Sequence, residues 1–152
     1  MRRSEKQVND SDSIQKIIKN ALVCRLALAD GDQPYVIPVS FGIDNSELYV
    51  HSALQGKKVD IIRKNPKIGF EIESDVSIVP HEIACKWGFR YRSIVGTGVA
   101  ELVTDNLEKR FGISVIMSHY TDKEFSFPQE ALDKTLIIKI KILSMTVKQS
   151  GF

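Results

Sequence analysis

The stretch Tyr35-Val-Ile-Pro-Val-Ser-Phe-Gly42, and the segment Leu48-Tyr-Val-His-Ser-Ala-Leu-Gln-Gly-Lys-Lys58 that follows a short turn, decide the fold of this chain. Both contain β-branched and aromatic residues, which favour strands. The second runs into a glycine and two lysines, and the helical pattern that starts there stops at Asn65-Pro66. A proline disfavours the helical conformation of the residue before it. The pattern therefore predicts two antiparallel strands followed by a short helix.

The lysine pair at the start of this helix is the first functional signal. Cations are mildly unfavourable there, because the unpaired N–H groups of the first turn carry partial positive charge. Lys57 and Lys58 are explained if an anion binds at this end. Their ammonium groups, the free N–H groups and the Ser52 hydroxyl would then hold a phosphate. The alternative is a basic helix start that is simply solvated.

Alternating apolar residues predict strands through the rest of the chain. Residues 22–30 form the first, ended by the hairpin signal Asp30-Gly31-Asp32. The strand at 35–41 contains Pro38, which cannot donate a ladder hydrogen bond and therefore predicts an open edge, a bulge or a ligand contact. Further strands are expected at 48–53, 68–73, 89–103 and 138–142, and helices after Ser11-Asp12-Ser13, at 57–64 and after the capping-box pair Asp105 and Glu108.

About six strands joined mainly as antiparallel hairpins, with three helices, predict a mainly β protein with peripheral helices. Its expected architecture is a small barrel. Residues 1–152 contain no linker, repeat or low-complexity tract, so we expect a single domain. Residues 1–10 are polar and are expected to form a loose N-terminal segment or, alternatively, to take part in a subunit contact.

Composition narrows the function classes. The net charge is +2, with basic and acidic residues interleaved, which argues against nucleic-acid binding. No apolar run approaches the ~20 residues of a membrane span, and the N-terminus lacks the apolar core of a signal peptide, so we expect a cytoplasmic protein. Cys24 and Cys85 provide no disulfide framework, and His81 with Cys85 is too few ligands for zinc. No metal site is expected.

Four motifs stand in a recognisable order and spacing, namely Pro38-Val-Ser-Phe-Gly42, Leu48-Tyr-Val-His-Ser-Ala53 with Gly56-Lys-Lys58, Asn65-Pro66, and Tyr91-Arg-Ser-Ile-Val-Gly-Thr-Gly98. With these motifs the chain resembles the flavin-binding split-barrel proteins related to pyridoxamine phosphate oxidase, and most of all the branch named for 5-nitroimidazole resistance reductases. The similarity runs from about Ile14 to Gln149.

This resemblance implies a six-stranded antiparallel split β-barrel that forms a homodimer, with one FMN in each of two clefts between the subunits. Lys57 and Lys58 would meet the FMN phosphate, the role that the helix argument gives them independently. Trp87 and Tyr91 would close the site from the second subunit. The full set of cofactor-binding residues implied by the resemblance is Val39, Ser40, His51, Ser52, Ala53, Lys57, Lys58, Trp87, Tyr91 and Ser93.

The resemblance also implies an activity, with two departures. Ser40 stands where this branch often carries asparagine, and the chain lacks the Arg-Leu-x-Pro type tail of the true pyridoxamine phosphate oxidases, which argues against that reaction. We expect an FMN-dependent oxidoreductase that passes electrons from a reduced donor such as NAD(P)H to a nitro compound or quinone-like acceptor. His51 is the catalytic candidate. The alternatives are a barrel that binds deazaflavin or haem, and a flavin carrier or sensor without a substrate.

Overall fold

A single antiparallel sheet organises the computed structural model, which describes residues 4–152. Its strand order is β2-β1-β5-β6-β7-β4-β3, and every neighbouring pair is antiparallel. The mainly β class is therefore confirmed. The strands are β1 (Cys24–Asp30), β2 (Gln33–Val39), β3 (Phe41–Asp44), β4 (Glu47–Ala53), β5 (Lys67–Val79), β6 (Gly88–Val103) and β7 (Thr135–Ser150).

The sheet has seven strands instead of the expected six, because the stretch expected to be one strand at 35–41 is two. β2 pairs with β1 and β3 pairs with β4, so the chain changes partner at Ser40, which belongs to neither strand. The two edge strands of the sheet are thus consecutive in sequence. This single-residue connection closes the sheet on itself as a split barrel. Pro38 lies on the edge strand β2, as its missing donor predicted.

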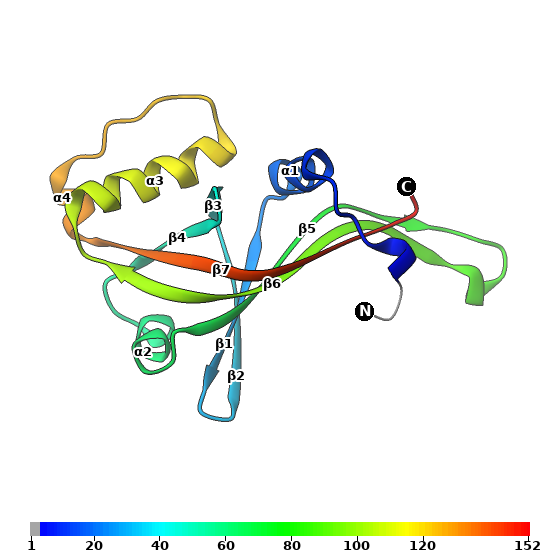
Figure 1. The fold of residues 1–152 in the computed structure, drawn as a ribbon, viewed down its shortest axis with the longest axis horizontal. Coiled ribbons are helices and arrows are strands. Elements are labelled where there is room, and N and C mark those ends of the chain that lie inside the picture. The colour runs from blue at the N-terminus through cyan, green and yellow to red at the C-terminus, as the bar shows by residue number, and fades with distance from the viewer. Residues whose placement is uncertain (1–3) are drawn as a thin grey trace.

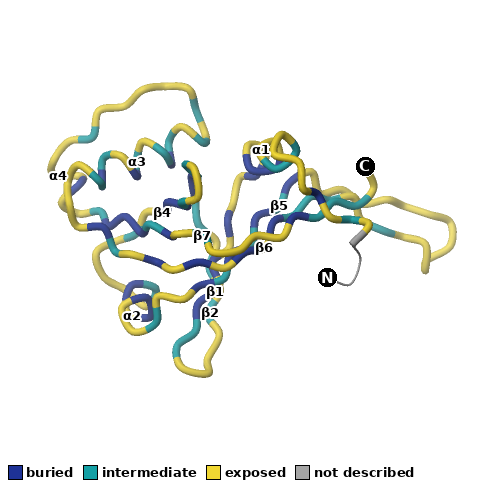
Figure 2. The backbone as a smooth tube through the Cα atoms, viewed as in Figure 1, coloured by how far each residue is buried: buried dark blue, intermediate teal, exposed yellow. Residues whose placement is uncertain are grey.

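Alternate residues of the strands fill the barrel interior, as Figure 2 shows by the alternation of buried and exposed segments. Leu26, Phe70, Ile94, Ile138 and Ile140 point inward and are almost completely buried. Burying one such side chain contributes about 1.5–3 kcal/mol. The period-two pattern in the sequence therefore identified the inner face of these strands correctly.

The helices lie at the periphery of the sheet. Figure 1 shows α3 and α4 on one side of the end formed by β4 and β7, and α2 on the other side. Asp105 accepts a hydrogen bond from the Glu108 N–H and caps α3 as expected, whereas α1 is capped one residue earlier than expected, by Asp10. The short helix α4 was not expected. The bounds are α1 (Ser11–Asn20), α2 (Lys57–Lys64), α3 (Asn106–Tyr120) and α4 (Gln129–Asp133), with 3-10 turns at Ser4–Lys6 and Ala84–Lys86. No helix within residues 4–152 is long and apolar enough to cross a membrane.

The N-terminal segment packs against the sheet from residue 4 onward, where we expected a loose segment. The Val8 N–H donates to the Val147 carbonyl at 3.0 Å, and Gln7 forms a β-bridge with Lys148. The Val8 side chain is buried in the main core. Residues 1–3 of the expected loose segment lie outside the described residues.

A long hairpin extends from the body of the molecule (Figure 1). It begins after Asp75, which has a φ of 57° at an irregularity in the β5–β6 ladder, and we call residues 76–90 the arm. The strand expected over residues 68–73 continues through Ser74, which is still buried, and into the exposed arm up to Val79. Apolar side chains are exposed along the arm, namely Val76, Ile78, Val79, Ile83, Trp87 and Phe89.

Candidate functional site

The predicted lysine pair lies in a pocket at the start of α2, which we call the lysine pocket. It has a volume of about 340 Å³. Residues from β2, from the end of β4 and from the first turn of α2 surround it, so the sheet edge that Pro38 leaves open forms one wall. Its lining residues are Tyr35, Ile37, Pro38, Ser52, Gln55, Gly56, Lys57, Lys58 and Val59.

The electrostatics of the lysine pocket suit an anion. Within residues 4–152 neither Lys57 nor Lys58 forms an ion pair. The Lys57 ammonium lies 4.9 Å from the centre of the Tyr35 ring, a cation–π contact. Burial lowers the pKa of Lys58, which an incoming anion would offset by stabilising the ammonium form.

The helix start adds hydrogen-bond donors to the same pocket. Gly56 precedes α2 with a φ of 132°, a conformation that L side chains rarely adopt, and no side chain among residues 4–152 caps the first turn. The first N–H groups of α2 therefore remain available to a ligand. Asp60, the acid in this turn, lies 3.6 Å from Arg63. The residues present fit a phosphate group.

A second pocket lies on the other side of β4, beneath α3, and we call it the α3 pocket. It has a volume of about 480 Å³. His51 lines it, whereas its neighbour Ser52 lines the lysine pocket, because successive residues of a strand point to opposite faces. Ser40 Oγ lies 3.3 Å from His51 Nδ1 at its rim. The complete lining is Ser40, His51, Ile113, Ile116, Met117, Tyr120 and Thr135.

Close backbone packing and hydrogen bonds from Tyr120 and His119 hold the C-terminal end of α3 against its neighbours. A Cβ atom at Gly42 would lie 2.3 Å from the Val115 carbonyl oxygen, so only glycine lets the helix approach β3 this closely. The Tyr120 hydroxyl accepts from the Phe41 N–H and donates to the Leu22 carbonyl, each at 3.0 Å. These bonds tie the end of α3 to Phe41, which follows Ser40, and to Leu22, which precedes β1.

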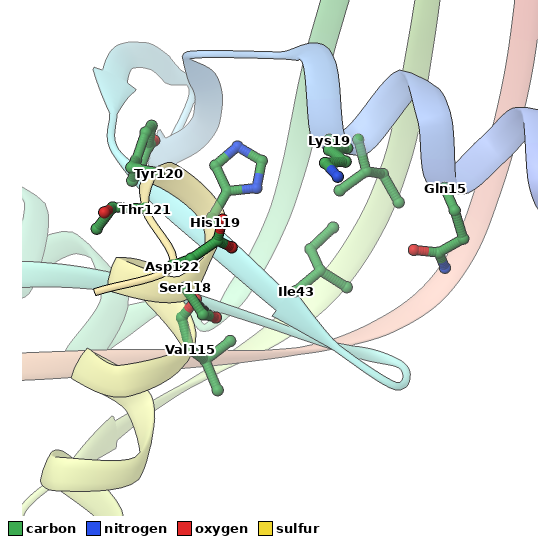
Figure 3. A pocket seen from close by; sticks show the side chains of 10 residues that line it. Gln15, Lys19, Ile43, Val115, Ser118, His119, Tyr120, Thr121 and Asp122 are labelled. Carbon is green, nitrogen blue, oxygen red and sulfur yellow. Dashed lines mark hydrogen bonds between the residues drawn. The ribbon is translucent and has the colours of Figure 1, made fainter. Parts of the chain in front are cut away.

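His119 contributes the third bond, to the end of α1. Its Nε2 lies 2.7 Å from the Ala21 carbonyl oxygen and must carry the proton, since a carbonyl oxygen only accepts. Ala21 is the C-cap residue of α1, so this bond joins the end of α3 to the end of α1. Figure 3 shows His119 and Tyr120 in a further pocket between α1 and the end of α3, into which Gln15 and Lys19 also project.

Comparison with known proteins identifies the family. A family model described as pyridoxamine 5'-phosphate oxidase matches residues 10–149. This chain belongs to the pyridoxamine 5'-phosphate oxidase family. All seven strands begin inside the matched range, and both pockets lie within it.

The most informative structural relative is a proposed 5-nitroimidazole antibiotic resistance protein from Bacteroides thetaiotaomicron VPI-5482. It is 30% identical, with a TM-score of 0.83 over 94% of this chain and 86% of the other. The FAD and heme binding protein from Mycobacterium smegmatis shares the fold, with a TM-score of 0.84, 18% identity and coverage of 97% and 74%. An uncharacterised Rhizobium meliloti (strain 1021) protein, RA0666, is 32% identical over 66 residues, which are 43% of each chain.

In this family member the ten residues expected to bind the cofactor fall into four groups. Ser52, Lys57 and Lys58 line the lysine pocket, and Ser40 and His51 line the α3 pocket. Val39 ends β2, half-buried against the core, and Ala53 ends β4 and is exposed. The remaining three lie in the arm or on β6 beyond it and line neither pocket, namely Trp87, Tyr91 and Ser93.

The apolar wall of the α3 pocket was missed in the sequence. Ile113, Ile116, Met117 and Tyr120 follow the spacing i, i+3, i+4 and i+7, which places them on one helical face. The capping-box pair predicted the helix, but this apolar face was not predicted. The signal for the pocket was therefore present in the sequence as a helical stripe of apolar residues. Leu107, at the start of the same helix, does not belong to this stripe and is 78% exposed.

Proposed function

We propose that this chain is an FMN-binding oxidoreductase that passes electrons from a reduced donor such as NAD(P)H to a small acceptor, a nitro compound or a quinone. The observation that carries the proposal is the lysine pocket. There, two lysines without an acidic partner in residues 4–152 stand beside uncapped helix N–H groups and a serine hydroxyl. This set of donors matches the phosphate of FMN.

Each group of residues would have its own task. Lys57, Lys58 and Ser52 would anchor the phosphate, and the backbone at Val39 and Ser40 would border the ring. His51 would orient the ring or the acceptor through its position beside Ser40. When bound, FMN would supply the electron transfer itself.

We further propose that the protein is a homodimer in which each FMN lies at the subunit interface. The arm supports this part of the proposal, because Trp87 and Phe89 are 55% and 62% exposed and form part of an exposed apolar surface typical of interfaces. Trp87, Tyr91 and Ser93 would then contact the cofactor of the partner subunit. A cytoplasmic location, where NAD(P)H is available, belongs to the same proposal.

The names of two relatives support the proposed oxidoreductase function. The Bacteroides relative is named for resistance to a nitroaromatic drug, which makes a nitro compound a reasonable acceptor to test. The Mycobacterium relative is named for binding FAD and heme. Because that relative shares the fold of this chain, haem should be tested if FMN does not bind. Deazaflavin should be tested in the same experiment.

A visible absorption spectrum of the freshly purified protein tests the proposal, with mass identification of any molecule released on denaturation. We expect a flavin spectrum and the mass of FMN. Oxidation of NAD(P)H with a nitro compound or a quinone present would then separate an enzyme from a flavin carrier. A colourless protein that also fails to bind added FMN would contradict the proposal.

A further inference from the structure

We propose that the α3 pocket is the binding site of the acceptor, and that the acceptor is a small, uncharged aromatic molecule with an oxygen atom at one edge, as in quinones and nitroarenes. The lining contains no aspartate, glutamate, lysine or arginine. The role of the bound molecule as an acceptor rests on the proposed oxidoreductase function, but the binding chemistry follows from the pocket itself.

The walls of the pocket favour an apolar ring. Ile113, Ile116 and Met117 come from adjacent turns of α3, and the Tyr120 ring completes the same helical face. The volume of about 480 Å³ lies within the range typical of small-molecule sites, roughly 300–1,000 Å³. An ionised group inside would lose its hydration without gaining an oppositely charged partner, which is strongly unfavourable.

The rim of the pocket provides a hydrogen-bond donor for an oxygen atom. Within residues 4–152 Ser40 is the only hydrogen-bond partner of the His51 side chain, and it contacts Nδ1. When the Ser40 hydroxyl donates to Nδ1, Nε2 carries the imidazole proton. That N–H is free to donate to a quinone carbonyl or to a nitro oxygen. The pocket therefore combines apolar walls with a donor at its edge.

The position of the pocket separates the acceptor from the anion site. His51 and Ser52 are neighbours on β4 but face different pockets, so only the thickness of one strand lies between them. An anionic phosphate in the lysine pocket and a neutral ring in the α3 pocket would not compete. For a quinone the overall reaction is NAD(P)H + H⁺ + quinone → NAD(P)⁺ + hydroquinone, in which the nicotinamide is oxidised and the quinone is reduced.

Calorimetric titration of the full-length protein with two matched quinones tests the proposal. Menadione is neutral, and 1,4-naphthoquinone-2-sulfonate presents the same ring system with a permanent negative charge. Both are titrated in the presence and in the absence of FMN. We expect menadione to bind at least about tenfold more tightly than the sulfonate, because the pocket has no cation for the sulfonate group.

Two substitutions on α3 locate the binding site. Met117→Lys places a charge in the wall and should weaken menadione binding by about tenfold or more, without changing the FMN affinity. Ser114→Lys introduces the same charge at an exposed position of the same helix that does not line the α3 pocket, and should leave menadione binding unchanged. Circular dichroism checks that both variants fold.

Other results of these titrations would overturn the pocket assignment or the oxidoreductase function. Equal affinity for the two quinones, or equal effects of the two substitutions, would overturn the pocket assignment. A loss of FMN affinity in Met117→Lys as large as the loss of menadione affinity would also overturn it, since the pocket would then hold the flavin ring. If menadione binds as expected and FMN does not, the binding chemistry stands and the oxidoreductase function falls.

Discussion

Ser40 Oγ lies 3.3 Å from His51 Nδ1, although the two residues are eleven positions apart in the chain. The register of the β3–β4 ladder explains this contact. Phe41 is paired with Val50, so the residue before Phe41 lies beside the residue after Val50. The contact therefore depends on the change of strand partner that occurs at Ser40.

This contact predicts that a substitution at Ser40 lowers the rate of turnover without a matching loss of FMN affinity. Ser40→Ala should lower the rate of quinone reduction by roughly two- to tenfold, the value of one hydrogen bond, because His51 loses its orienting partner. FMN affinity should change little, because only the Ser40 backbone would border the ring and neither side chain lines the lysine pocket that anchors the phosphate. Ser40→Thr retains the hydroxyl and should retain most of the activity. Steady-state kinetics measures the rate, and a titration measures FMN affinity. An unaltered rate in Ser40→Ala would argue against an orienting role for this contact.

The lysine pair should determine phosphate affinity. Lys57→Ala and Lys58→Ala should each weaken FMN binding by roughly 10- to 100-fold, since a hydrogen bond to a charged group is worth about 1.5–3 kcal/mol. Lys64→Ala is the matched control, because Lys64 ends the same helix and lies 3.6 Å from Asp30, away from the pocket. Fluorescence titration with FMN and with riboflavin checks this. Equal losses for riboflavin, which has no phosphate, would refute the phosphate assignment.

Lys58 also predicts a pH dependence. Burial lowers the pKa of this lysine, so it loses its proton below the ordinary value of 10.5. The ammonium form attracts the phosphate, and FMN affinity should therefore fall as the pH rises through that lowered pKa. Lys58→Arg keeps its charge in this range and should shift the fall to higher pH.

The affinity measurement should begin above pH 8, where the phosphate, with a second pKa near 6, is about fully ionised. Riboflavin measured in parallel corrects for ionisation of the ring. An affinity profile that is the same for the native protein and for Lys58→Arg would show that Lys58 does not contact the phosphate.

Tyr120 should contribute to stability through both of its hydrogen bonds. Tyr120→Phe leaves the Phe41 N–H and the Leu22 carbonyl without this partner, and we expect a loss of about 1–3 kcal/mol in the free energy of unfolding. Urea denaturation measures it. Tyr35→Phe is the control, because the Tyr35 hydroxyl forms no hydrogen bond within residues 4–152. A Tyr120→Phe variant as stable as this control would mean that other contacts hold α3 in place.

The arm should mediate self-association. Phe89→Lys places a charge on its apolar surface and should weaken the dimer by about 2 kcal/mol, roughly 30-fold in dissociation constant. Leu107→Lys changes an even more exposed apolar residue, on α3, and should have no effect. Sedimentation equilibrium measures both variants. A dimer weakened only by Leu107→Lys would place the interface on α3.

Local sequence determined most of the strands and their turns. The Asp30-Gly31-Asp32 hairpin and the turn at Asn45, which has a φ of 52°, appear where the sequence predicted them. The reason is that alternation and turn chemistry act between residues that are near one another in the chain. The lysine pair was likewise recognisable, because its misfit with the helix dipole is a local property.

Tertiary structure alone decided the change of partner at Ser40, the length of the arm and the position of the α3 pocket. Ser40 continues an apolar alternating run, and only the divergence of β1 and β4 explains why the ladder breaks there. The arm has no buried face, so no burial period marks it. Which face of α3 covers β4 depends on close packing at Gly42 and on the bonds of Tyr120. Those contacts join residues that lie 73 and 79 positions apart in the chain, and their register is set by packing across the fold.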